Sequence, residues 1–78
     1  MRELSQEEAI SLAKKAWPKG FPMTRIAGDR CEVGFFRSPE LKSEGMPTVM
    51  GSERSWLLAF RDANVSPKLI EEFMASLA

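Results

Sequence analysis

The chain has 78 residues, of which 44% are hydrophobic and 28% charged, and its 11 basic and 11 acidic side chains give a formal net charge of zero. This composition is typical of one small folded domain, and the balanced charge provides no general attraction for nucleic acid or an anionic membrane. Because histidine is absent, the usual centre of general-base, triad and transition-metal chemistry is missing, so we expect no enzymatic activity, catalytic residue, metal site or cofactor.

Cys31 is the only cysteine, so no internal disulfide can form, and the polar N-terminal residues do not resemble a signal peptide. The longest apolar run, residues 56–60, is far shorter than the roughly 20 residues that a membrane span requires. We therefore expect a cytoplasmic protein with no membrane partner. Cys31 is expected to be a small hydrophobic residue on a strand rather than a nucleophile, because no histidine can serve as its base.

Residues 5–17 predict an amphipathic helix. Ser5 followed by Glu8 has the spacing of a capping box, in which each residue satisfies a backbone group of the other. Pro18 and Gly20 end the pattern. The apolar residues at helical spacing, which we expect to form one buried stripe, are Ala9, Ile10, Ala13, Ala16 and Trp17.

Residues 24–37 predict a β-hairpin, with a single bent strand as the alternative. Gly28-Asp29 is a two-residue turn that starts with glycine, as type II′ turns do. The alternation that follows the turn places Cys31, Val33 and Phe35 on one face. The residues on the other face are Arg30, Glu32, Gly34 and Phe36.

Residues 38–51 lack periodicity and contain two prolines and two glycines, so we expect a mobile loop. Residues 52–61 predict a strand, since aromatic side chains favour strands and Trp56, Leu58 and Phe60 alternate with the residues Ser55, Leu57, Ala59 and Arg61. We expect this strand to pair antiparallel with the hairpin, although a connection of this length permits either direction.

The last predicted helix begins near Ser66. Ser66 can cap it, Pro67 suits the first helical position, and Val65 and Ile70 have the spacing of a hydrophobic staple. Its apolar face contains Leu69, Ile70, Phe73, Met74 and Leu77. This face could bind a partner's groove, but in so small a chain we expect it to complete the core.

These elements predict a single α+β domain over residues 1–78, in the order α-β-β-β-α. Each helix has one apolar side, so both are expected to cover the same face of a three-stranded, mainly antiparallel sheet. The result would be a two-layer sandwich with one open sheet face.

The open face is the candidate interface of the predicted sandwich. We expect it to contact a protein partner, with a homodimer as the simplest case, or to offer a strand edge to a partner segment. The residues expected there are Arg30, Phe36, Leu57, Ala59 and Arg61.

The alternative function is weak binding of single-stranded nucleic acid. In that case Phe36 would stack on a base while Arg30, Arg37 and Arg61 contact phosphates. The usual basic footprint is missing, because residues 18–61 contain only two more basic than acidic side chains.

Overall fold

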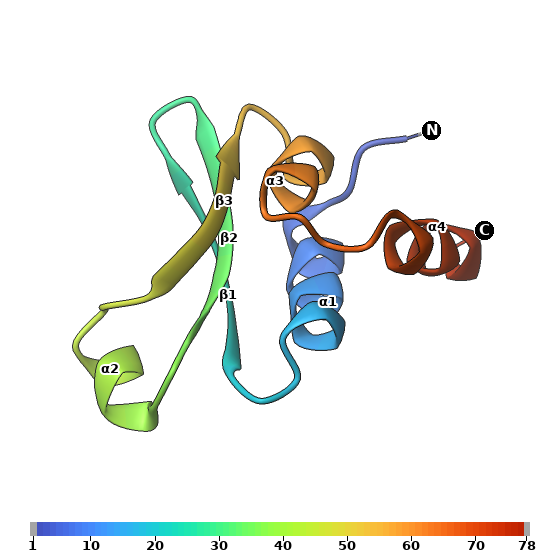
Figure 1. Ribbon diagram of the computed structural model, residues 1–78. Helices are drawn as coiled ribbons and strands as arrows, with labels where there is room; N and C mark the ends of the chain where they lie inside the picture. The colour runs from blue at the N-terminus through green and yellow to red at the C-terminus, as the bar shows by residue number, and fades with distance from the viewer. Residues whose placement is uncertain (1, 78) are drawn as a thin grey trace.

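The computed structural model describes residues 2–77, which form four helices and one three-stranded antiparallel sheet of strand order β1-β2-β3 (Figure 1). The predicted α+β class is therefore confirmed. The elements in chain order are α1 (Gln6–Ala16), β1 (Phe21–Ala27), β2 (Arg30–Phe36), α2 (Pro39–Ser43), β3 (Thr48–Glu53), α3 (Trp56–Asp62) and α4 (Pro67–Ser76).

Helix α1 begins at the predicted capping box. The Ser5 hydroxyl accepts a hydrogen bond from the Glu8 N–H at 3.2 Å, and the Glu8 carboxylate accepts one from the Ser5 N–H at 2.9 Å. The buried side of the helix contains Leu12 in place of the predicted Ile10. Leu12 is fully buried, whereas Ile10 is 42% exposed.

Strands β1 and β2 form the predicted hairpin, which starts three residues earlier than expected, at Phe21. Of the two turn residues, only Gly28 has a positive φ, as a type II′ turn requires. Val33 lies in the main core, and Phe35 packs on Trp17 after α1. The predicted inward face of β2 is therefore correct.

The segment predicted as a mobile loop, residues 38–51, contains helix α2 and most of strand β3. Ser38 caps α2 by accepting from the Leu41 N–H at 3.1 Å, and Pro39 occupies the first turn. At the other end, Gly45 has φ +66 and Met46 N–H donates back to the Leu41 carbonyl. This is a Schellman motif, the usual end of a helix at glycine.

The predicted strand over residues 52–61 is wrong after Glu53, because Trp56–Asp62 form helix α3. Ser55 caps it by accepting from the Leu58 N–H at 3.2 Å. Trp56, Ala59 and Phe60 are buried, and their spacing is that of one helix face. Leu58, which strand alternation would bury, is 41% exposed.

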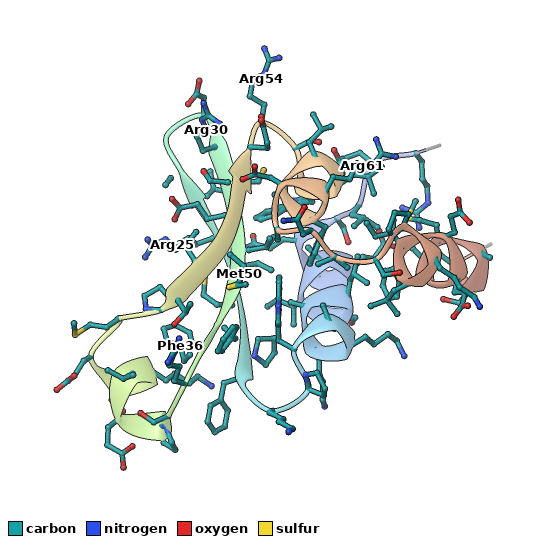
Figure 2. The ribbon with its side chains drawn as sticks, viewed as in Figure 1. Arg25, Arg30, Phe36, Met50, Arg54 and Arg61 are labelled. Atoms are coloured by element: carbon teal, nitrogen blue, oxygen red, sulfur yellow. The ribbon has the colours of Figure 1, made fainter. Side chains whose placement is uncertain are left out.

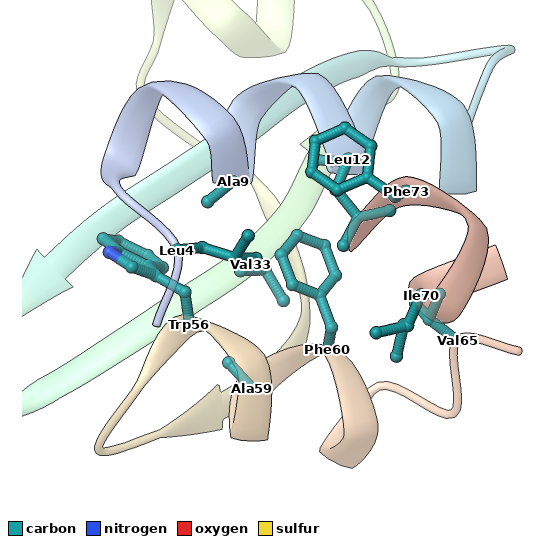
Figure 3. Close-up of a cluster of buried hydrophobic side chains, with 11 residues drawn as sticks. Leu4, Ala9, Leu12, Val33, Trp56, Ala59, Phe60, Val65, Ile70 and Phe73 are labelled. Atoms are coloured by element: carbon teal, nitrogen blue, oxygen red, sulfur yellow. The ribbon is translucent and has the colours of Figure 1, made fainter. Parts of the chain in front are cut away.

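Helix α4 has Pro67 at its first turn as predicted, but the Ser66 side chain makes no capping hydrogen bond. Val65, Ile70 and Phe73 are all buried and belong to the core (Figure 3). Helix α4 packs against α1 and lies beyond it from the sheet (Figure 1). The helices that cover this face of the sheet are therefore α1 and α3.

The core fills the space between one sheet face and the helices. Helix α1 packs mainly on β1 and helix α3 mainly on β3, and Val33 of the central strand lies between them (Figure 3). Gly51 lets α3 approach β3, since a Cβ there would overlap the Ala59 carbonyl oxygen. This arrangement leaves the opposite sheet face without a long helix over it.

Candidate functional site

The opposite face of the sheet, here called the open face, follows from the strand alternation. Because Val33 points into the core, its neighbours Glu32 and Gly34 belong to the other face, as do the residues paired with them. The residues assigned to the open face are Phe21, Met23, Arg25 and Ala27 from β1, Arg30, Glu32, Gly34 and Phe36 from β2, and Val49 and Ser52 from β3.

Apolar side chains gather at the end of this face nearest α2. Met50 belongs to this face too, because it precedes Gly51, which pairs with the core-facing Val33. We call the set Phe21, Met23, Phe36, Val49 and Met50 the open-face patch. Phe21, Val49 and Met50 are 39%, 40% and 41% exposed, which is high for large apolar side chains. Met23 is only 4% exposed, although it lies outside the main core cluster. The patch is therefore a small second apolar cluster whose outer members contact water.

Gly34 explains how this cluster can form. Met23 pairs with Gly34 across the strands, so no side chain from β2 competes for the space there. The register of β3 against β2 shifts at Val33 and Gly34, which is a β-bulge at Met50. A Cβ on Gly34 would overlap the Thr48 carbonyl oxygen. Glycine is therefore required at the position of β2 that pairs with the bulge of β3.

Charged residues lie at the other end of the open face, and they are paired. Arg25 forms a hydrogen-bonded ion pair with Glu32. Arg30 donates to the Ser52 carbonyl at 3.3 Å and lies 3.6 Å from the Glu53 carboxylate. These arginines are exposed but locally neutralised, so this end of the open face has no strong field of either sign. At the patch end, the Lys42 ammonium lies over the Phe21 ring, 5.6 Å from its centroid.

The five predicted interface residues are not brought together. Arg30 and Phe36 belong to the open face as expected. Leu57, Ala59 and Arg61 lie on α3, against the opposite side of the sheet, and Ala59 is fully buried. The expectation of a shared sheet face is wrong for these three, because the alternation assigned to residues 52–61 belongs to a helix.

The arginines of the nucleic-acid alternative are also separated. Arg61 lies on α3, whereas Arg25 and Arg30 lie on the sheet (Figure 2). Arg37 donates to the Thr48 hydroxyl at 3.3 Å, near the end of β2 remote from Arg30. The described residues therefore present no continuous arginine stripe across one face.

On both edges of the sheet, side chains form hydrogen bonds with backbone groups of the edge strand. On β1, Pro22 has no N–H, and the Gln6 amide donates to the Thr24 carbonyl at 3.5 Å. On β3, the Ser52 N–H donates to the Asp62 carboxylate at 3.0 Å, while its carbonyl accepts from Arg30. An added strand would have to displace these bonds, so the edges favour partner pairing less than the open face does.

Cys31 is half-buried and packs against the core. Burial, and then the nearby Glu3 carboxylate, raise the pKa of its thiol. Its Sγ lies 3.9 Å from the Arg54 carbonyl oxygen. The thiol is therefore protonated near neutral pH, which does not suit a nucleophile.

Four members of the open-face patch were absent from the predicted interface. Phe21 and Met23 lie before residue 24, where the predicted hairpin starts, and Val49 and Met50 fall in the predicted mobile loop. Phe21 and Met23 are two residues apart, so they continue the two-residue period of the strand that follows. This spacing is the signal that could have extended β1 to Phe21.

Comparisons with protein-family models, curated proteins and solved structures found no match for this chain. Across residues 2–77, none of the helices combines the length and apolar character that crossing a bilayer requires. Within the same residues, no group of three or more potential metal-ligating side chains occurs.

Proposed function

We propose that this protein is a non-enzymatic interaction module that self-associates through its open face. The observation that carries the proposal is the open-face patch, in which three large apolar side chains, Phe21 on β1 and Val49 and Met50 on β3, are each about two-fifths exposed at one end of the sheet. Contiguous exposed apolar surface on a small domain is typical of an interaction site. A cytoplasmic setting is part of the proposal and is supported by the lone, unpaired Cys31.

A second copy of the chain fits the charges around the patch. The charged end of the open face carries both signs, in the pairs Arg25–Glu32 and Arg30–Glu53. A two-fold arrangement brings the same surface of each copy together, so a neutral, mixed surface meets no net repulsion. A strongly acidic or basic partner would find no complementary field at this charged end.

The size of the face limits the strength of association. With seven residues per strand in β1 and β2, a rise of about 3.3 Å per residue and a strand spacing of about 4.8 Å give a face of roughly 23 by 14 Å. The area of a face with these dimensions is well below the ~800 Å² that each partner buries in a standard stable interface. We therefore expect a weak, reversible dimer rather than a permanent one.

The test is sedimentation velocity from about 10 μM to about 1 mM, a range that covers weak association. The unaltered protein should show a sedimentation coefficient that rises with concentration. Met50→Lys places a charge in the patch at a side chain that is already 41% exposed, so it should abolish the rise without unfolding the domain.

Leu58→Lys is the matched control, since Leu58 is also 41% exposed but lies on α3, against the other side of the sheet. It should leave self-association unchanged. A sedimentation coefficient that does not depend on concentration, or equal loss in both variants, would overturn the proposal. Salt-dependent retention of a monomer on single-stranded DNA would favour the nucleic-acid alternative instead.

A further inference from the structure

A second feature, independent of the open-face patch, is a shallow hollow of about 440 Å³ where α1 ends and the chain turns into β1. Its volume is within the range of small-molecule sites, roughly 300–1,000 Å³. The apolar residues that line it include Trp17, Pro18, Gly20 and Phe35, and the charged ones are Lys19 and Arg37. The hollow thus combines aromatic walls with two cationic side chains.

The aromatic walls are held in place by the core. The Trp17 ring stacks on the fully buried Phe60, with centroids 6.1 Å apart, and lies 6.0 Å from the Phe35 ring. Trp17 itself is only half-buried, so part of its indole remains accessible. Gly20 lies close to Phe35, since a Cβ there would be 2.6 Å from the ring carbon Cδ2. The hollow is therefore a preformed feature.

The charge of the hollow is not neutralised within the described chain. The ion pairs among residues 2–77 involve neither Lys19 nor Arg37. The Nε of Arg37 donates to the Thr48 hydroxyl at 3.3 Å, which orients the guanidinium and leaves its terminal N–H groups available. Arginine is well suited to carboxylate because its planar fork can donate two parallel hydrogen bonds.

We propose that this hollow binds a small carboxylate with a flat apolar body, such as an arylalkanoate. The apolar body packs on Trp17 and Phe35, and the carboxylate accepts hydrogen bonds from Arg37, with Lys19 adding positive charge. Two observations select this class of ligand. The aromatic lining favours an apolar body, and the two unpaired cations favour an anionic end over a neutral or cationic one.

The test uses 4-phenylbutyrate and its neutral counterpart 4-phenylbutanol, titrated into ¹⁵N-labelled protein and followed by two-dimensional NMR. The Trp17 indole N–H should shift with phenylbutyrate, while that of Trp56, only 6% exposed, serves as an internal reference. The alcohol should bind more weakly, because it cannot pair with Arg37. Arg37→Gln should weaken phenylbutyrate binding about fivefold, as expected for one exposed ion pair, and leave the alcohol unaffected.

Arg54→Gln is the matched control, because Arg54 is also exposed but lies at the junction of β3 and α3 and does not line the hollow. It should not change binding. Equal affinity for acid and alcohol, no effect of Arg37→Gln, or shifts scattered over the surface would each overturn the proposal. Because the Met50→Lys variant leaves the hollow intact, the result can be repeated in it to separate ligand binding from self-association.

Discussion

At the scale of single residues, the N-terminal cap of α1 has the clearest electrostatic consequence. A side-chain hydrogen bond from Arg2, then the Ser5 N–H, lower the pKa of the Glu8 carboxyl from 4.5 to about 2. The carboxylate also sits at the positive end of the helix dipole. Because the pKa of Glu8 is lower in the folded state, its contribution to the stability of the fold is fully present above pH 4.5. That contribution is lost as the pH falls from 4.5 towards 2.

We expect Arg2→Gln to raise the pKa of Glu8, since the largest cause of its shift is removed. The value should remain below 4.5, because the Ser5 N–H still donates to the carboxylate. Titration of the Glu8 side-chain ¹³C resonance measures both values. Arg61→Gln, on α3, should leave the Glu8 titration unchanged. An unchanged Glu8 pKa in Arg2→Gln would contradict the assigned ion pair.

At the scale of elements, α3 packs closely on β3 at Gly51. Gly51→Ala should destabilise the protein by about 3 kcal/mol or more, because the overlapping atoms belong to the backbone of α3 and the helix must move. Gly28→Ala is the comparison, since Gly28 has φ +64 but open space around it. Backbone strain alone should cost about 1 kcal/mol there. Urea denaturation of both variants measures the difference, and an equal or smaller loss for Gly51→Ala would argue against direct helix–strand packing.

The elements also show why the sequence predicts part of this fold and not the rest. Helix α1, the hairpin and helix α4 each combine a clear period with an end signal. Trp56 and Phe60 lie four residues apart, a spacing that fits one face of a strand and one face of a helix equally. The deciding signals were local: Ser55 as a cap, and Asn64, whose φ of +60 ends α3 in a Schellman motif.

The same local signals account for the missed part of the site. Ser38-Pro39 starts α2 and Gly45 ends it, yet five residues are too few to show a period. Because α2 shows no period, the sequence does not locate strand β3 and predicts a loop at Val49 and Met50. Arg30 and Phe36 were assigned to the open face correctly, because the hairpin fixes the alternation of β2.

At the scale of the whole molecule, the sheet has two unlike faces. One is covered by α1 and α3 and holds the main core, while the other carries the small open-face patch at one end and paired charged residues at the other (Figures 1 and 3). Helix α4 extends the main core beyond α1 instead of covering the open face. The stability of the domain and its proposed interface therefore depend on different residues, so each can be altered separately.

This separation gives a prediction for α4. Phe73 is 5% exposed and lies in the main core. Phe73→Ala should cost about 3–5 kcal/mol, which is comparable to the roughly 3–5 kcal/mol expected for the whole of so small a domain. We therefore expect its cooperative unfolding transition, measured by circular dichroism in urea, to disappear.

Phe73→Leu should retain a cooperative transition, because it keeps most of the apolar volume. Leu58→Ala, at an exposed position of α3, should have a urea unfolding midpoint close to that of the unaltered protein. If Phe73→Ala unfolded with an unchanged midpoint, α4 would be a separable arm available to a partner. Its burial on α1 argues for the opposite: the last helix of this chain completes the core, and the apolar surface left for a partner is that of the open-face patch.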